Sequence, residues 1–143
     1  MRISRKELER LGVDMPEEKP KSKYGATKTT YNGVIYASKA EALRAEELDM
    51  MLEGGAIEWW IGQPKFRLGC PENVYVADFL VASRVSLFDG EDDGVEVWVE
   101  DVKGMQTPKF KKDLKLWVRY GPMPLHILKR SGKTFTVSIV CPE

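Results

Sequence analysis

Two aspartates and a lysine stand in stretches of the chain where apolar residues alternate with other residues. Along residues 95–103, the row of alternate positions that holds three valines ends in Asp101 and Lys103. Because alternate side chains of a strand point to the same face, this pattern predicts an apolar face that ends in an acid and a base. On a predicted strand over residues 74–82, the same rule puts an acid into an apolar row, Val74, Val76, Asp78 and Leu80.

A carboxylate on an apolar face requires a partner, because burying an unpaired charge costs free energy. If the two strands pair as a hairpin, Asp78, Asp101 and the carbonyl of Val102 meet at one end of the sheet. These are hard oxygen ligands of the kind that suits Mg²⁺ or Mn²⁺. Lys103 would then orient a water molecule or neutralise a phosphate. A purely structural ion pair of Asp101 and Lys103 explains the same residues, and the pattern leaves both interpretations open.

A third acid precedes these strands, on a predicted helix. Ser38 and Glu41 have the spacing of a capping box, which predicts that a helix begins here and runs to about Glu53, before Gly54-Gly55. Glu41 falls in line with the apolar residues of the helix, Ala45, Leu48 and Leu52. Glu41 is therefore a candidate member of the site, although its role in the cap would explain the residue equally well.

The other elements follow from turn residues and periodicity. The chain is predicted to form an α/β fold in which helices flank a mixed sheet, in the order α-β-β-β-α-β with an extra terminal strand. A second helix, with Pro108 at its first position, is predicted to end before Gly121-Pro122. The turn at 89–94 is predicted to close a hairpin. The predicted strands cover residues 34–36, 57–61, 65–68, 74–82 (continuing with a bend to Phe88), 95–103, 125–129 and 135–140.

These motifs together resemble the PD-(D/E)XK nuclease superfamily, and in particular phage endonuclease I and Holliday-junction-resolvase-like members. The resemblance rests on Ala77-Asp78-Phe79 and on 99–104, Val-Glu-Asp-Val-Lys-Gly, with Gln63-Pro64-Lys65-Phe66 as a supporting strand motif. The proline of the signature is replaced here by Ala77. Glu100 and Asp101 compete for the acidic position, and the spacing to Lys103 favours Asp101. The resemblance covers residues 24–130 and implies a restriction-endonuclease-like core in which Glu41 joins the site.

The same resemblance implies a Mg²⁺-dependent DNA endonuclease whose products carry 5′-phosphate and 3′-hydroxyl ends. Residues 1–33 are predicted to be a basic arm and residues 34–143 the nuclease domain. A resolvase of branched DNA would be a homodimer, whereas a simple nuclease need not be. A non-catalytic DNA-binding protein that retains the fold is the alternative. Candidate contacts to DNA are Arg44 and Gln63 near the centre and the lysines of the second helix, Lys109, Lys111, Lys112 and Lys115.

The composition of the chain argues against several other classes of protein. The 22 basic and 22 acidic residues cancel, so only local basic patches can attract nucleic acid. The two cysteines lack the paired spacing of a zinc site, and a single histidine, His126, argues against a Ser-His or Cys-His nucleophile. No apolar stretch has the length of a membrane span or a signal peptide, so the expected location is the cytoplasm.

Overall fold

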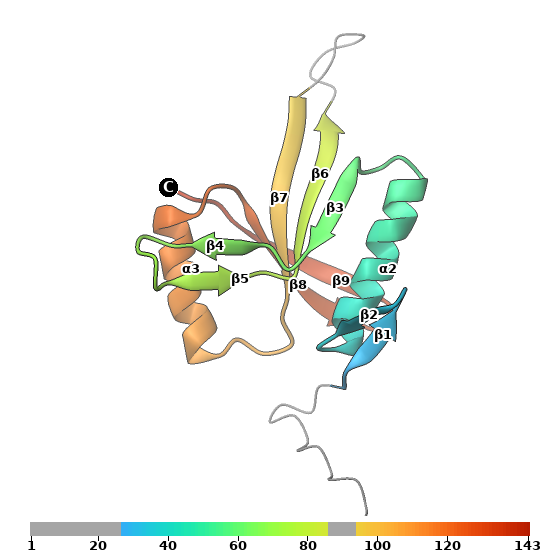
Figure 1. The fold of residues 1–143 in the computed structure, drawn as a ribbon, viewed down its shortest axis with the longest axis horizontal. Helices are drawn as coiled ribbons and strands as arrows, with labels where there is room; N and C mark the ends of the chain where they lie inside the picture. Colours follow the sequence, from blue (N-terminus) through green and yellow to red (C-terminus); the bar gives the residue numbers. More distant parts are fainter. Residues whose placement is uncertain (1–26, 86–93) are drawn as a thin grey trace, which may run out of the picture.

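A five-stranded mixed sheet forms the centre of the computed structural model, which describes residues 27–85 and 94–143. Its strands lie in the order β3-β6-β7-β8-β9 (Figure 1), and only the β7–β8 pair is parallel. The bounds are β3 Trp59–Gly62, β6 Phe79–Val85, β7 Gly94–Val102, β8 Leu125–Ser131 and β9 Thr134–Val140. The predicted α/β class with a mixed sheet is thus confirmed.

Two helices cover opposite faces of this sheet (Figure 1). Helix α2, Lys39–Glu53, begins after Ser38, whose hydroxyl accepts a hydrogen bond from the Glu41 N–H. Helix α3, Pro108–Tyr120, has proline at its start and is capped by Thr107. Helix α3 also provides the crossover that the parallel β7–β8 pair requires. Both helices begin where the capping residues predicted them.

Each face of the sheet has its own apolar core. The core under α3 includes Val99, Phe110, Trp117 and Leu125, and the core under α2 includes Leu48, Phe79, Val81, Val102 and Leu128. Strand β7 supplies both cores, so its last residues are buried on either side: Val99, Glu100, Asp101 and Val102 are all less than 10% exposed. Strand β7 is therefore the central strand on which charged residues are held away from water.

Two short hairpins complete the fold. Strands β1, Thr29–Tyr31, and β2, Val34–Tyr36, pair beside α2. Their turn uses Asn32 and Gly33 at positive φ, as the Asn-Gly sequence predicts. Strands β4, Lys65–Arg67, and β5, Val74–Val76, pair beside α3, where Phe66 and Tyr75 pack edge-on against Trp117.

The prediction of one strand over residues 74–82 is wrong. The chain leaves β5 after Val76, passes Ala77 and Asp78, and begins β6 in another sheet. The apolar row assigned to this segment is also wrong at its start, because Val74 and Val76 are 43% and 47% exposed while Tyr75 and Ala77 are buried. Alternation fails here because the chain changes sheets between residues 76 and 79.

The remaining differences concern the ends of elements. Strand β3 begins at Trp59 rather than Ile57, and β1 brings residues 29–31 into the folded part, inside the predicted arm. Most of the arm, residues 1–26, and nearly all of the predicted 89–94 turn lie outside the described residues. Neither helix that the structure describes is long and apolar enough to cross a membrane.

Candidate functional site

Asp78 lies at the point where the chain passes from β5 to β6, beside the end of β7. Phe79 pairs with Glu100, so the antiparallel register brings Asp78 next to Asp101. The backbone of Asp78 is fixed on both sides, because its N–H donates to the Glu100 carbonyl (3.1 Å) and its carbonyl accepts from the Gln63 N–H (2.9 Å). Its Oδ2 accepts a 2.7 Å hydrogen bond from the Val102 N–H. Its position is therefore set by main-chain bonds.

Asp101 is completely buried and is contacted by two side chains. The hydroxyl of Tyr75, from β5, donates a hydrogen bond to Asp101 Oδ2. The Lys103 ammonium lies 2.9 Å from Oδ1, an ion pair that lacks hydrogen-bond geometry, so Oδ1 accepts no hydrogen bond from the described residues. The ion pair of Asp101 and Lys103 that the sequence left open as a structural alternative is thus present. Both carboxylate oxygens of Asp101 are thus already contacted by protein side chains.

Glu41, in the first turn of α2, interacts with the same cluster through its charge. The Ser38 hydroxyl accepts from the Glu41 N–H and donates to the Glu41 carboxylate, both at 3.2 Å, so Ser38 caps the helix and Glu41 contacts the cap. Its charge also contributes to raising the pKa of Asp78, and the charge of Asp101 in turn raises the pKa of Glu41. Glu41 therefore takes part in both arrangements, the helix cap and the acidic cluster.

The electrostatics of the cluster favour a cation. Burial, then the charges of Asp101 and Glu41, raise the pKa of Asp78 to about 8. Burial also raises the pKa of Glu41. Burial alone would lower the pKa of Lys103, but the carboxylates of Asp101, Asp78 and Glu41 outweigh it and raise that pKa. With this pKa, Asp78 keeps a proton at neutral pH, and a bound cation can take the place of that proton among the three acids.

Glu100, adjacent to Asp101, points to the opposite face of β7 and forms a second charged group. Its carboxylate binds the Arg44 guanidinium through two bonds, 2.6 and 2.7 Å, and accepts a 3.0 Å bond from the Trp98 indole. Arg44 also pairs with Glu47 at 2.8 Å. Arg44 had been a candidate contact to DNA, but its guanidinium is engaged here by two carboxylates. The sequence analysis considered Glu100 only as the rival of Asp101 for the acidic position and did not predict its pairing with Arg44.

The other residues predicted to contact the substrate, Gln63 and the four lysines of α3, do not gather at one place. Gln63 is exposed, with φ of 54°, and touches the site through its backbone bond to Asp78. Of the four lysines on α3, only Lys109 lines a cavity beside Lys103, whereas Lys111, Lys112 and Lys115 are exposed elsewhere on the helix. Tyr75 was missed. The alternate positions Tyr75, Ala77, Phe79 and Val81 are all apolar or aromatic and all buried, and this row could have predicted that Tyr75 points inward.

The donor set fits a hard divalent cation in its chemistry, since Asp78, Asp101 and Glu41 offer only oxygen atoms. In the described part of the chain, no three His, Cys, Asp or Glu side chains stand in a metal-holding arrangement. Lys103 and Tyr75 occupy the two oxygens of Asp101 instead. The flexible Lys103 side chain, 32% exposed, is the group whose movement would open Oδ1 to a metal.

Fold and site together define a mixed α/β protein with a buried acidic cluster at one end of its central sheet. The family model described as "Protein of unknown function (DUF1064)" matches residues 21–135, so the chain belongs to this family. No curated protein and no solved structure gives a significant match to the chain.

Proposed function

We propose that this protein is a metal-dependent DNA endonuclease with a restriction-endonuclease-like core of the PD-(D/E)XK type. The observation that carries the proposal is the meeting of Asp78, on the link between β5 and β6, with Asp101 and Lys103 at the end of β7. Glu41 of α2 lies near enough for its charge to raise the pKa of Asp78. The same four residues carried the resemblance in the sequence. A buried group of acids in which Asp78 keeps a proton up to about pH 8 supports binding of a divalent cation in place of that proton.

Asp78 and Asp101, with Glu41, would hold Mg²⁺ or Mn²⁺, and the main-chain carbonyl of Val102 is the further candidate ligand. When bound, the ion would activate water and stabilise the charge that develops on the phosphate during hydrolysis. Lys103 keeps its proton, because the surrounding carboxylates raise its pKa. Its ammonium would therefore position the attacking water and offset charge on the phosphate. Tyr75 orients Asp101 through its hydrogen bond.

The substrate class proposed is DNA, with branched DNA such as a Holliday junction as the structure-specific candidate. Symmetric resolution of a junction requires two centres and therefore a homodimer. Single cuts in linear or single-stranded DNA require only one chain.

The test is to incubate the protein with linear duplex, single-stranded and four-way-junction DNA, in Mg²⁺, Mn²⁺ or EDTA. We expect cleavage in either metal and none in EDTA. The Asp101→Asn variant should lose at least about a hundredfold in rate, the scale of a lost charge-stabilising group, and keep DNA binding. Its matched control is Glu72→Gln, which removes an exposed carboxylate in the loop between β4 and β5. This variant should cleave normally.

Equal cleavage by Asp101→Asn and Glu72→Gln would remove the acidic cluster from the reaction. If every DNA is bound but none is cut in either metal, the protein belongs to the alternative class of non-catalytic DNA-binding proteins.

A further inference from the structure

Strand β9 forms one edge of the five-stranded sheet, with β8 as its neighbour on the inner side. Within residues 27–85 and 94–143, no strand pairs with its outer side. Side chains on both faces of β9 are exposed, and only Phe135 and Val140 are half-buried. Natural proteins protect such edges, because the free N–H and C=O groups of an edge strand can pair with another chain.

The opposite edge of the sheet carries protection that β9 lacks. Strand β3 has four residues and is followed by Gln63, with φ of 54°, and by Pro64. A short strand, a bend and a proline all hinder pairing with a further strand. Strand β9 has seven residues, and the stretch 134–141 contains no proline, no glycine and no charged side chain. Strand β9 is therefore the edge that is suited to pairing.

The β8–β9 hairpin determines which backbone groups of β9 are free. Its loop has two residues, 132–133, and begins with Gly132 at positive φ, so the two residues that flank the loop form a hydrogen-bonded pair. In an antiparallel ladder, such pairs alternate with pairs that are not hydrogen-bonded. It follows that Phe135, Val137 and Ile139 turn their N–H and C=O groups outward, away from β8.

The same three residues are apolar and share one face of the sheet. Val137 and Ile139 are 52% and 59% exposed, and Phe135 packs at the margin of the core under α2. A second β9, antiparallel about a two-fold axis at Val137, would place each Val137 opposite its copy and each Phe135 opposite the partner's Ile139. All the outward groups would then exchange hydrogen bonds, and apolar side chains would lie opposite apolar side chains. The strand carries no charge that could repel its copy.

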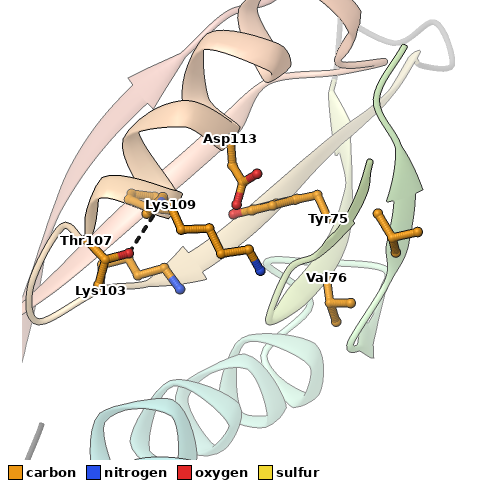
Figure 2. A pocket seen from close by; sticks show the side chains of 8 residues that line it. Tyr75, Val76, Lys103, Thr107, Lys109 and Asp113 are labelled. Carbon is orange, nitrogen blue, oxygen red and sulfur yellow. Dashed lines mark hydrogen bonds between the residues drawn. The ribbon is translucent and has the colours of Figure 1, made fainter. Parts of the chain in front are cut away.

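We infer that β9 is a homodimer interface at which two copies of this chain pair edge to edge, so that their sheets become continuous. The patch is self-complementary, as a two-fold interface requires. Opposite residues of antiparallel strands point to the same face, so the Asp101 clusters of both copies lie on one face of the joined sheet. The cavity between α3 and β5, beside Lys103 (Figure 2), has no lining residue from β8 or β9, so pairing leaves it open.

The pairing of β9 is independent of the proposed endonuclease activity. It supplies the two centres that symmetric cuts in a DNA junction would require, and this consequence alone rests on the proposed function.

Sedimentation of the full chain, in EDTA and without DNA, tests the interface from about 1 to 300 μM, since pairing of two short strands is expected to be weak. The wild type should pass from monomer to dimer as its concentration rises. Val137→Lys should weaken association at least about tenfold, because two ammonium groups would meet at the axis. The matched control is Val34→Lys, which changes a valine of β2 that is 51% exposed and should dimerise as the wild type does.

Two further measurements examine the register of the pair. An equal mixture of Val137→Lys and Val137→Glu should regain the association that each variant lacks alone, because opposite charges then meet at the axis. In the wild type, the N–H groups of Phe135, Val137 and Ile139 should exchange with solvent more slowly at high than at low protein concentration. This second readout requires no variant to fold.

A wild type that stays monomeric throughout, equal association of Val137→Lys and Val34→Lys, or outward N–H groups whose exchange does not change with concentration would overturn the inference. A mixture of the two Val137 variants that stays monomeric would overturn the pairing about Val137. A monomer that cuts DNA would refute the interface alone, whereas a β9 dimer that never cuts DNA would refute the endonuclease alone.

Discussion

The buried position of Asp78 lowers the stability of the fold, although the proposed metal site requires it. Its carboxylate is mostly buried beside Asp101 and Glu41, and its pKa is raised for these reasons. Without a cation, the charged form of Asp78 therefore destabilises the fold. A metal site requires this arrangement, because separated and fully solvated acids would bind a cation weakly.

Replacement of Asp78 by asparagine tests whether this carboxylate both destabilises the fold and binds the metal. In EDTA at neutral pH, we expect Asp78→Asn to be more stable than the wild type by on the order of 1 kcal/mol. The amide is neutral in both the folded and the unfolded chain, whereas Asp78 must take up a proton on folding because its pKa rises to about 8. The amide oxygen can still accept from the Val102 N–H. Mg²⁺ should raise the melting temperature of the wild type and leave that of the variant unchanged. Thermal unfolding with and without Mg²⁺ measures both effects. A variant that is less stable in EDTA, or an equal response to Mg²⁺, contradicts this account.

At the scale of elements, the two-bond contact of Arg44 with Glu100 ties α2 to β7. Arg44 lies one turn after Glu41, and Glu100 precedes Asp101 in the chain. The ion pair thus holds the helix that carries one acid of the cluster against the strand that carries another. Because Glu100 is completely buried, its charge depends on Arg44 for compensation.

Loss of Arg44 should therefore be costly. Arg44→Met leaves a buried carboxylate unpaired, and we expect a loss of about 3–5 kcal/mol in the free energy of unfolding, measured with urea. The double variant Arg44→Met with Glu100→Leu should recover most of it, since apolar side chains replace the whole pair. Glu47→Gln, which removes only the more exposed partner of Arg44, should cost less than about 1 kcal/mol. A similar loss for Glu47→Gln and Arg44→Met would show that Glu100 does not depend on Arg44.

Local sequence signals predicted the elements well, and contacts between distant segments poorly. The capping box at Ser38 and the proline at the start of α3 act within one turn, so they located both helices. The alternation of β7 correctly put Asp101 and Lys103 on one face. The break after Val76 was not predicted, because nothing local marks the change of sheet.

The same distinction applies to the site. Asp78, Asp101 and Lys103 were predicted from alternation along two strands, Glu41 from its place on the helix, and all four from their match to a family pattern. The contact of Tyr75 with Asp101 and the pairing of Glu100 with Arg44 were missed, since the partners lie 26 and 56 residues apart and only the folded chain brings them together.

At the scale of the whole molecule, stability must respond to pH in two opposite directions. The pKa of Asp78 is raised from its ordinary value of 3.8 to about 8. The stability of the folded protein therefore falls as pH rises between these two values, because the folded protein holds this proton and the unfolded chain does not. His126 acts the other way. Burial lowers its pKa, and Arg44 lowers it further, against the raising effect of Glu100 and Glu96. The folded protein therefore resists protonation of His126.

Replacement of the only histidine isolates its share of this pH dependence. The contribution of His126 is fully present above pH of about 6.5, its ordinary pKa, and is lost as pH falls below that value, because the unfolded chain binds the proton more readily. The ring also stacks on Trp98, so His126→Gln should lower stability most near neutral pH. Urea unfolding in EDTA at pH 5, 6 and 7 should give a difference between wild type and variant that grows with pH. A difference that stays constant would mean that His126 is protonated as readily in the folded protein as in the unfolded chain, and a difference that grows towards pH 5 would mean that the folded protein binds this proton more readily. Either result contradicts the lowered pKa of His126.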